Sequence, residues 1–555
     1  MAMIRRTEVD GIPAVVAPAT GGPVRAGLVF RVGQADETLP RSGITHLIEH
    51  LVLHPLGHGD YHHNGSTAAA FTSFHVQGSE QEVARFLTAV CDSLAAPPLA
   101  RLEAEKGVLR TEAATHGTGV LGSLAVWRHG AHDYGLPGMP EWGLHAITAD
   151  DVRRWTARFF TRDNAVLWVT GGDVPGGLRL RLPSGVREPM PTPSSALPVT
   201  PASYGGAADA VAWDSVVAES DAAAVFSDAL ERVMYRELRH DSGLSYTVRT
   251  EYSPRGDGGA VITALADALP EKQDAVLGGF AQVLRAVRAG RIEPGDVTGA
   301  VARRLEALRH PGVDAARLPW FAREVLTGRP LRTTDELAAG LAAVTVADVV
   351  ACGQAAERTG LLMTPPHAHG GAATGVYPAV ETSPAPVAGV SYRARAGHAE
   401  TILAGPEGIS AVGRSGSATV RLDACAAVLS WPDGRRLFVG LDATSVTLEP
   451  TLYRNGADAV RALDDHVPPH LRVPMPARDP RSIPQPRRAT VAPQRRRQLL
   501  VAALWALLAL ACFAGGVLVL SGPLDDDARQ GGVGGLLVGG FFVYMAVRAV
   551  RRNRL

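Results

Sequence analysis

A run of 22 residues without a charged side chain, residues 499–520, constrains this chain more than any other feature. As an α-helix it would extend about 33 Å, enough to cross roughly 30 Å of bilayer hydrocarbon. A second apolar stretch, residues 531–547, is shorter and glycine-rich, and it follows closely. A buried helix of a soluble protein is the alternative interpretation. We predict a membrane hairpin of two transmembrane helices, at residues 498–521 and 531–548.

The charges around these stretches predict an orientation. Residues 476–555 hold twelve arginines and four aspartates, a net charge of +8, although the whole chain has 55 basic and 55 acidic residues. Most of the arginines lie outside the two apolar stretches, whereas the connecting loop holds Asp525, Asp526, Asp527 and Arg529. Because basic flanks stay on the cytoplasmic side, we expect a multi-pass protein of the cell membrane with its soluble domains and both termini cytoplasmic. The same flanks suit contact with anionic membrane lipid.

Composition excludes several classes for the rest of the chain. Residues 1–475 carry a net charge of −8, which argues against nucleic acid as a partner. The four cysteines are far apart, so neither a disulfide framework nor a cysteine zinc cluster is expected. With 46% hydrophobic and 20% charged residues, the chain as a whole is globular.

Three proline-rich stretches have the composition of linkers, residues 183–205, 364–388 and 474–494. They delimit predicted domains at residues 1–182, 206–363 and 390–475, with a basic, proline-rich linker at 476–497. The third segment shows short alternating strands and then one helix at 457–467. Strands closed by one C-terminal helix are similar to a pleckstrin-homology-like barrel. We predict a small β-rich domain there, with a docking or spacer role.

The first two segments share an internal echo. The residues ITADDV at 147–152 resemble VTVADV at 344–349, each with threonine at a helix N-cap position. Each is followed by a helix-like run and an apolar strand. In the first segment, residues 82–95 have helical apolar spacing, with Cys91 on the core face. We predict an α+β fold with two tandem homologous domains; chance similarity in an alanine-rich chain is the alternative.

The segment SGITHLIEHLVLHP places three chemically active side chains on one predicted helix, which begins near Ser42 and ends before Pro55. His46, Glu49 and His50 occupy positions i, i+3 and i+4 and share a face. Both imidazoles can therefore bind one metal while Glu49 points at the open coordination position. This HxxEH pattern is the reverse of HExxH. Two histidines of an ordinary core helix are the alternative.

A second predicted helix, RLEAEKGVLRTEAATH, has two glutamates on an otherwise apolar stripe. Carboxylates in such a place are costly unless they meet a cation or a hydrogen-bond donor. That cost would be offset if Glu112 were a third metal ligand and if Glu105 accepted a hydrogen bond from the outer nitrogen of a ligand histidine. The set predicts one Zn²⁺ per chain.

Together these residues resemble the insulinase/pitrilysin family of zinc peptidases, in the two-domain form of the mitochondrial processing peptidase. That family has HxxEH followed by two glutamates seven residues apart, here Glu105 and Glu112. The stretch MYRELRHDSGLSYTVRTEYSPRGDGG is similar to its second-domain motif, whose arginine and tyrosine contact substrate; they correspond to Arg239 and Tyr246. A solvated arginine and a half-buried tyrosine are the alternatives for these two. The motifs cover about residues 1–365.

The resemblance implies a zinc-dependent metalloendopeptidase that acts on short or unfolded peptides. Glu49 would be the general base, and Arg239 and Tyr246 would bind the substrate carbonyl or oxyanion. Because the family pairs two such halves, a homodimer or a paired related subunit is expected. The peptide would add a strand to a sheet edge near residues 71–76.

The sequence departs from the family in two places. Ala69 stands where the family has a substrate-contacting asparagine, although Phe71 and Thr72 keep the flanking pattern and are predicted to bind substrate. The 62-residue interval from His50 to Glu112 is also shorter than in the family. A non-catalytic peptide-binding or scaffold subunit on the same fold therefore remains the alternative function.

Four further histidines lie close to the predicted metal helix: His54, His58, His62 and His63. A second metal site is one interpretation, because imidazole is a common metal ligand. A polar, partly protonated loop near the cleft is the other, and we favour it.

Overall fold

The chain is described here from a computed structural model that divides it into two compact units. The residues that the structure describes are 4–18, 21–57, 62–116, 119–368, 377–378, 383–395, 400–486, 493–520, 536–545 and 547. The first unit comprises Met1–Tyr392, Thr401–Pro450 and Asn455–Pro480, and the second comprises Arg393–Glu400, Thr451–Arg454 and Arg481–Leu555.

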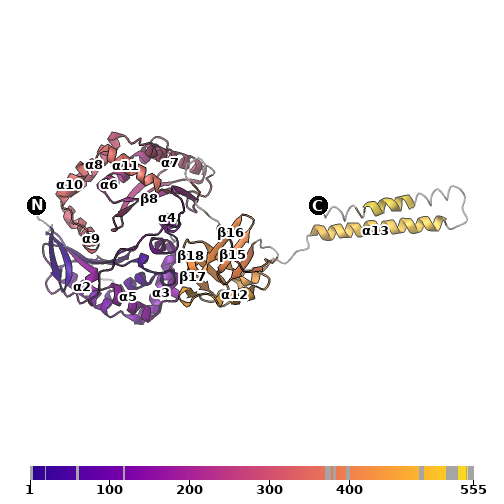
Figure 1. Cartoon of the computed structure of the whole chain (residues 1–555), viewed down its shortest axis with the longest axis horizontal. Helices are drawn as coiled ribbons and strands as arrows, with labels where there is room; N and C mark the ends of the chain where they lie inside the picture. Colours follow the sequence, from indigo (N-terminus) through magenta and orange to yellow (C-terminus); the bar gives the residue numbers. More distant parts are fainter. Residues whose placement is uncertain are drawn as a thin grey trace. The chain divides into compact units, whose positions relative to one another are not determined.

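The first unit begins with a six-stranded sheet in the order β1-β2-β6-β3-β5-β4 (Figure 1). Its strands are β1 (Arg5–Val9), β2 (Ile12–Ala17), β3 (Val24–Phe30), β4 (His62–Thr67), β5 (Thr72–Gly78) and β6 (Ala165–Thr170). The pair β2 and β6 is parallel, and the other neighbours are antiparallel. The strand β4 forms one edge, next to the helix that carries the predicted metal residues.

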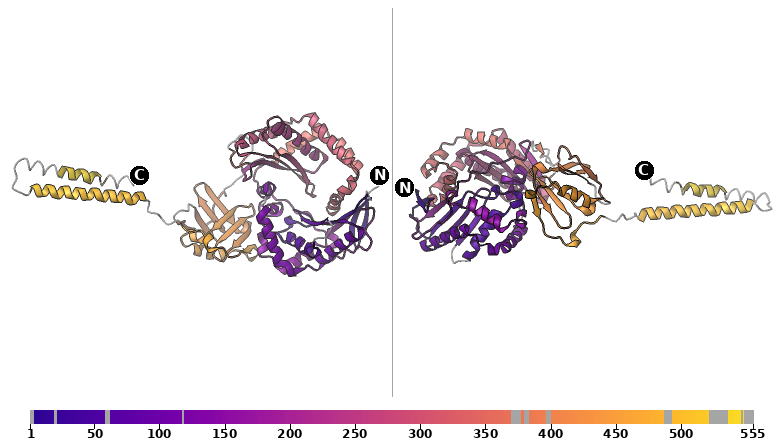
Figure 2. Two further views of the ribbon diagram at one scale, coloured as in Figure 1. Left: turned by 180° about the vertical axis from the view of Figure 1, so that it is seen from behind. Right: turned by 60° about the horizontal axis from the view of Figure 1, so that its bottom comes forward.

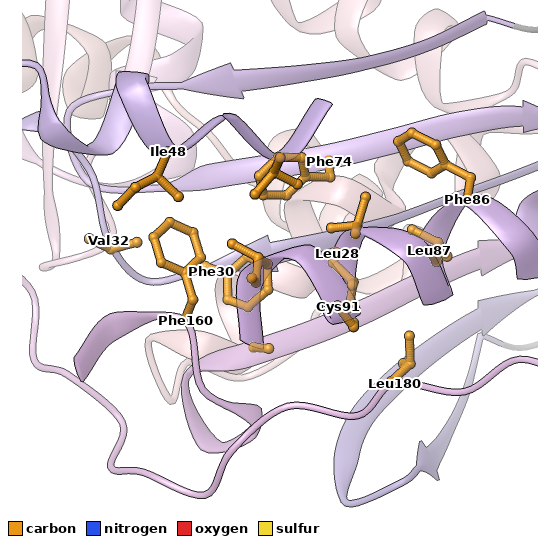
Figure 3. Packing of buried hydrophobic residues seen from close by; sticks show 14 of the residues in the cluster. Leu28, Phe30, Val32, Ile48, Phe74, Phe86, Leu87, Cys91, Phe160 and Leu180 are labelled. Atoms are coloured by element: carbon orange, nitrogen blue, oxygen red, sulfur yellow. The ribbon is translucent and has the colours of Figure 1, made fainter. Parts of the chain in front are cut away.

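The helices of this domain are α1 (Ile44–Leu53), α2 (Glu80–Ala95), α3 (Leu102–His116), α4 (Gly119–His129) and α5 (Ala149–Phe159). Apolar residues of α1, α2 and α5 pack against the sheet in one buried cluster. Figure 3 shows this core, which includes Ile48 of α1 and Phe30 and Phe74 of the sheet. Cys91 of α2 is fully buried there, as its helical position predicts, and burial raises the pKa of its thiol.

The second domain repeats this plan. Its strands are β7 (Ala202–Gly205), β8 (Ala210–Ala218), β9 (Val248–Pro254), β10 (Gly259–Asp267), β11 (Leu361–Thr364) and β12 (Tyr377–Pro378). They follow the order β12-β7-β11-β8-β10-β9, which matches the first sheet at five of its six positions; the edge strand β12 is parallel to β7, whereas β1 is antiparallel to β2. The parallel pair β7 and β11 corresponds to β2 and β6. The α+β prediction is confirmed, and the shared strand order supports duplication.

Its helices are α6 (Asp221–Met234), α7 (Gln273–Arg288), α8 (Pro294–Leu308), α9 (Val313–Leu326), α10 (Thr334–Ala342) and α11 (Val346–Arg358). The two threonines of the internal echo are both N-caps: Thr148 begins α5 and Thr345 begins α11, each in a capping box with an aspartate. The second sheet extends beyond the predicted limits of 206 and 363, because β7 and β12 lie outside them. Both strands are only two to four residues long, and their prolines and glycines conceal them in the sequence.

Each domain places one helix on the other domain's sheet. Leu124 of α4 packs on the second sheet, and buried Arg128 of the same helix donates to the Asp214 carboxylate of β8 at 3.1 Å. Reciprocally, Leu318 and Phe321 of α9 are buried against the first sheet. Figures 1 and 2 show both helices between the two sheets. The two domains of this unit therefore share apolar surface and a buried ion pair.

Two four-stranded sheets follow. The first contains β13 (Val390–Tyr392), β14 (Thr401–Gly405), β15 (Gly408–Gly413) and β16 (Gly416–Arg421), and the second contains β17 (Cys425–Ser430), β18 (Arg436–Gly440), β19 (Ser445–Leu448) and β20 (Arg472–Pro474). The helix α12 (Gly456–Asp464) is not the last element, because β20 follows it and pairs parallel to β17. The predicted order of strands closed by a C-terminal helix is therefore wrong in this detail. Apolar residues of β17, β18 and β20 pack against residues 131–146 of the first domain.

The second unit contains α13 (Pro493–Leu520) and a helix at Leu536–Met545. The rings of Trp505 and Phe542 stack with centroids 5.2 Å apart, and Gly539 lies against Phe513. Over the part of the chain that the structure describes, no single helix is both long and apolar enough to span a membrane. One bent pair, α10 with α11, has the length and composition.

Candidate metal centre

A buried carboxylate accepts hydrogen bonds from the N-terminal turn of the helix α1. The two oxygens of Glu37 accept hydrogen bonds from the backbone N–H groups of Gly43 and Thr45, at 2.7 and 2.9 Å. These donors belong to the N-terminal turn, where backbone N–H groups have no partner within the helix. Burial raises the pKa of Glu37 to about 8. The helix then runs to Leu53, close to the limits expected from the sequence.

Three side chains converge beside this helix. One ligand atom from each of His46, His50 and Glu112 lies within 4.8 Å of the others. His50 Nε2 is 3.8 Å from Glu112 Oε2. In the described part of the chain, this is the one group of three or more histidine, cysteine, aspartate or glutamate side chains close enough to share an ion. The tertiary fold thus brings together the residues that the sequence predicted as ligands.

The outer nitrogen of each histidine meets a carboxylate. His50 Nδ1 lies 3.7 Å from Glu105 Oε2, and Glu105 is itself held by Arg101 at 3.1 Å. His46 Nδ1 lies 3.1 Å from Glu141 Oε1. Such partners orient a ligand imidazole and keep its other nitrogen available for metal. Sequence reasoning placed Glu105 in this role but missed Glu141.

The charge around His46 favours its protonated form. Burial by itself would lower the pKa of His46, but the hydrogen bond and charge of Glu141, with the charges of Glu49 and Glu112, raise it overall. The same negative charges would favour a bound cation. The site is therefore electrostatically prepared for a positive ion.

Glu49 is buried at 6% exposure and is held from the sheet edge. The Thr67 hydroxyl donates to Glu49 Oε2 at 2.7 Å. Gly65 of β4 lies so close that a Cβ there would be 2.6 Å from Glu49 Cγ. Burial raises the pKa of Glu49, whereas the Thr67 bond and the two nearby histidines lower it. The edge strand therefore fixes the glutamate next to the three candidate ligands.

Phe71 and Thr72, which the sequence predicts to bind substrate, are buried in the structure. Phe71 is 8% exposed and packs toward α9, where the guanidinium of Arg323 lies 5.3 Å from its ring centroid. Thr72 is fully buried and donates to the Val32 carbonyl at 2.9 Å. Strand β5 pairs with β3 on one side and β4 on the other, so it offers no free edge. Residues 71–76 therefore do not form an edge themselves, and the sheet edge nearest to them is β4, which pairs with β5.

Arg239 and Tyr246 lie together in the second domain. Arg239 belongs to a π-helical turn, Tyr235–His240, that continues α6, and such turns often mark functional sites. Its guanidinium lies 4.8 Å from the ring centroid of Tyr246 and 5.1 Å from that of Tyr235. The two predicted residues line a pocket of about 490 Å³ with Lys272, and Tyr246 is 78% exposed. An arginine and a phenol are thus presented to an incoming group.

The four additional histidines do not form a second cluster among the described residues. His54 Nδ1 lies 3.6 Å from Glu105 Oε1, and the ring of His63 packs on Phe86. His62 is exposed on β4, whereas His58 lies outside the described residues. These positions agree with a polar rim along the site.

Solved structures identify the fold. A protease from Helicobacter pylori matches with a TM-score of 0.55 and 16% identity, over 66% of this chain and 100% of that one. A putative M16-like peptidase from Alicyclobacillus acidocaldarius matches with 0.51 and 16%, over 66% and 98%. The fold is that of M16-like peptidases. It agrees with the resemblance of the motifs to the insulinase/pitrilysin family.

The same fold occurs in a chain of complex III2 from Candida albicans, with a TM-score of 0.55 and 15% identity over 66% of this chain and 96% of that one. No family model and no curated protein matches the sequence. The likeness therefore establishes an M16-like peptidase fold, and the activity must be argued from the site.

Proposed function

We propose that this protein is a zinc metallopeptidase. The observation that carries the proposal is the convergence of His46, His50 and Glu112 from two helices, with a buried glutamate beside them. Zinc–nitrogen and zinc–oxygen bonds of about 2.0–2.2 Å place tetrahedral ligand atoms roughly 3.4 Å apart. The observed 3.8 Å between His50 Nε2 and Glu112 Oε2 is close to that spacing. The donor set therefore fits zinc.

The chain supplies a base and a means to hold it. Bound zinc contributes Lewis-acid chemistry that polarises the scissile carbonyl and acidifies a water molecule. With zinc held by His46, His50 and Glu112, Glu49 would take a proton from the attacking water and return it to the leaving amine. Because Thr67 already donates to Oε2 of Glu49, we assign Oε1 as the oxygen that accepts the proton. Burial and the Thr67 bond restrict the side chain to this position.

We infer that the substrate is a short or unfolded peptide added to the edge strand β4. This strand is one of the two edges of the first sheet, and it is the edge that lies next to Glu49, through Gly65 and Thr67. An extended peptide can hydrogen-bond to such an edge through its backbone. The side chains of His62, Asn64 and Ser66 are exposed along it. These three side chains would contact every second residue of the bound peptide.

The proposed active unit is a homodimer or a pair with a related subunit. In the second domain, the half-buried Arg239 lies with its guanidinium against the ring of the exposed Tyr246. In a twofold pair of such chains, they would reach the metal residues of the partner and bind the substrate carbonyl or the developing oxyanion. A cation and a phenolic O–H suit that charge.

The alternative is a non-catalytic peptide-binding or scaffold subunit. Ala69 lacks the side chain that the resembling peptidases use there, and the fold also occurs in a complex III2 chain. The Glu112 side chain is 44% exposed, more than the two histidines at 24% and 23%. These observations favour this function as the second candidate.

A Glu49→Gln variant separates the two functions. The amide cannot act as a base, so peptide cleavage should disappear while zinc content, measured by atomic absorption, stays near one per chain. Glu306→Gln, at a side chain 80% exposed on α8, is the matched control and should cleave normally. Cleavage that survives in Glu49→Gln would contradict the proposed base, and a purified wild-type chain that digests no peptide from a library would favour the scaffold.

We also propose that the second unit tethers the protein to the cell membrane, with the first unit cytoplasmic. The 22 uncharged residues at 499–520, the arginine flanks and the ring contacts between α13 and the helix at Leu536–Met545 support a hairpin. Close packing at Gly539 is typical of helix pairs in lipid. Membranes washed with alkaline carbonate should retain the chain, and its release by this wash would argue against the tether.

A further inference from the structure

A second pocket, of about 530 Å³, lies among α6, α8, α9 and α10 of the second domain. Figure 1 shows α6, α8 and α10 in the second domain and α9 toward the first sheet. Apolar and aromatic side chains form much of its wall, namely those of Tyr252, Leu308, Trp320, Leu337 and Leu341. A volume of this size falls within the range of small-molecule sites, about 300–1,000 Å³.

Four arginines also line this pocket, and three of them are paired with carboxylates. The pairs are Arg304 with Asp228 at 2.9 Å, Arg329 with Glu219 at 2.8 Å, and Arg332 with Asp221 at 2.8 Å. Within the described ranges, Arg317 forms no ion pair with a carboxylate. It donates to Thr334 Oγ1 and to the Arg332 carbonyl, both at 2.9 Å. The pocket therefore holds one cation whose charge is not directly matched.

The nearest acid reaches Arg317 only through a neighbour. Thr334 donates to Asp314 Oδ1 at 2.5 Å and at the same time accepts from Arg317. Burial lowers the pKa of Arg317, and the adjacent Arg332 adds to this effect, whereas Asp314 opposes it. A partly buried guanidinium without a direct counter-ion is costly, and an anion in the pocket would relieve that cost.

One further donor in the pocket wall lacks an acceptor. The buried Nε–H group of Arg304 has no hydrogen-bond partner among the described residues, whereas Arg329 Nε lies 3.3 Å from Glu324 Oε2. Buried donors are normally satisfied, so each such group needs an explanation. Oxygen atoms of a bound ligand are suitable acceptors. The wall thus combines guanidinium donors with apolar surface, and its three carboxylates, Glu219, Asp221 and Glu324, pair with Arg329 and Arg332 and leave Arg317 without a direct counter-ion in the described part of the chain.

We propose that this pocket binds a small organic carboxylate with an aromatic or aliphatic body, with the carboxylate on Arg317 and the body against Trp320. Carboxylates match the planar, multi-donor guanidinium group. The ring of Trp320 and the leucines enclose an apolar body. This site is separate from the proposed zinc chemistry and does not depend on it.

Isothermal titration calorimetry of the full chain in detergent tests the proposal, with 3-phenylpropionate as the probe and neutral 3-phenylpropanamide as its matched analogue. The acid should bind saturably and more tightly than the amide. Arg317→Met, which keeps an apolar stem, should weaken binding of the acid by about tenfold or more and leave the amide unchanged. Arg309→Met is the control, because Arg309 is 74% exposed at the end of α8.

Further variants keep the test decisive. Trp320→Leu should weaken binding of both probes, and it serves if Arg317→Met fails to fold. Equal binding of the acid by wild type and Arg317→Met would overturn the proposal, as would the lack of saturable binding to wild type. Binding abolished by a chelator but unaffected in Arg317→Met would place the carboxylate on the metal residues and would also overturn it.

Discussion

The two histidines of α1 differ in the carboxylate that holds their outer nitrogen. For His50 the partner is Glu105, which lies on α3, the helix that also carries Glu112. For His46 it is Glu141, 95 residues further along the chain. Glu141 precedes a short 3-10 turn, Trp142–His145, and belongs to no periodic pattern. No sequence signal pointed to it, because an irregular segment carries no spacing rule.

Glu141→Gln should weaken zinc binding. A glutamine keeps the size of the side chain but removes the negative charge that supports the His46 imidazole. Loss of such an outer partner typically costs about 10–100-fold in metal affinity. Competition with a fluorescent zinc chelator measures this change. Glu103→Gln, 77% exposed on α3, should match wild type, and equal zinc affinity in Glu141→Gln would show that the His46 contact has no supporting role.

Gly65→Ala should impair catalysis more than zinc binding. The new Cβ would lie 2.6 Å from Glu49 Cγ, so either the glutamate or the edge strand must move. A displacement of the base by about 1 Å can cost about 100-fold in rate. Peptide cleavage and zinc content of the same preparation give the comparison. Gly176→Ala is the control, because a Cβ at that position would meet no atom within 4 Å, and a fully active Gly65→Ala would contradict the close packing.

At the level of elements, the helix α4 of the first domain contacts both the second domain, through Asp214, and the linker that precedes it, through Ser194. His129 of α4 is buried, and its Nδ1–H donates to the Ser194 carbonyl at 2.6 Å. Burial lowers the pKa of His129 below its ordinary 6.5, with a further decrease from Arg128, although the Ser194 bond and nearby acids oppose this. The folded protein therefore keeps this imidazole neutral where the unfolded chain takes up a proton.

Stability should fall as the pH falls through 6.5, partly because of His129. In that range the unfolded state binds more protons than the folded state, so the unfolding free energy decreases by up to about 1.4 kcal/mol per pH unit and titrating group. His129→Gln keeps a donor for Ser194 but does not titrate. Urea unfolding at pH 7.5, 6.5 and 5.5 should show a smaller loss for the variant. The same pH dependence in both proteins would exclude His129 as a source.

At the scale of the whole molecule, the proposed active site draws residues from two chains. A chain with Glu49→Gln lacks the base, and a chain with Arg239→Met lacks the substrate-binding cation. In a mixed dimer one site carries both substitutions and the other carries neither. Random mixing of equal amounts makes half the dimers mixed, so about a quarter of wild-type activity should return.

Denaturation of both variants together, followed by refolding and a cleavage assay, tests this expectation. Each variant refolded alone is the control and should stay inactive. Activity that fails to return on mixing, although wild type refolds to an active enzyme, would show that Arg239 and Glu49 do not serve one site across a dimer.

The sequence by itself determined the elements and the chemistry they carry. The threonine N-caps, the apolar spacing of α2 and the positions of His46, Glu49 and His50 depend on neighbours within a few residues, which a helix places on one face. The repeated pattern also predicted two α+β domains. Spacing along one helix is fixed by its geometry, so these features could be read directly.

Only the tertiary structure decided which segments meet. It placed Glu141 on His46, Thr67 and Gly65 on Glu49, and Phe71 and Thr72 in the core instead of at a sheet edge. It also packed α4 of the first domain on the second sheet and α9 of the second domain on the first sheet. The reason is that strand order and domain packing depend on contacts between residues far apart in the chain, and no local pattern records which edge or which face remains free.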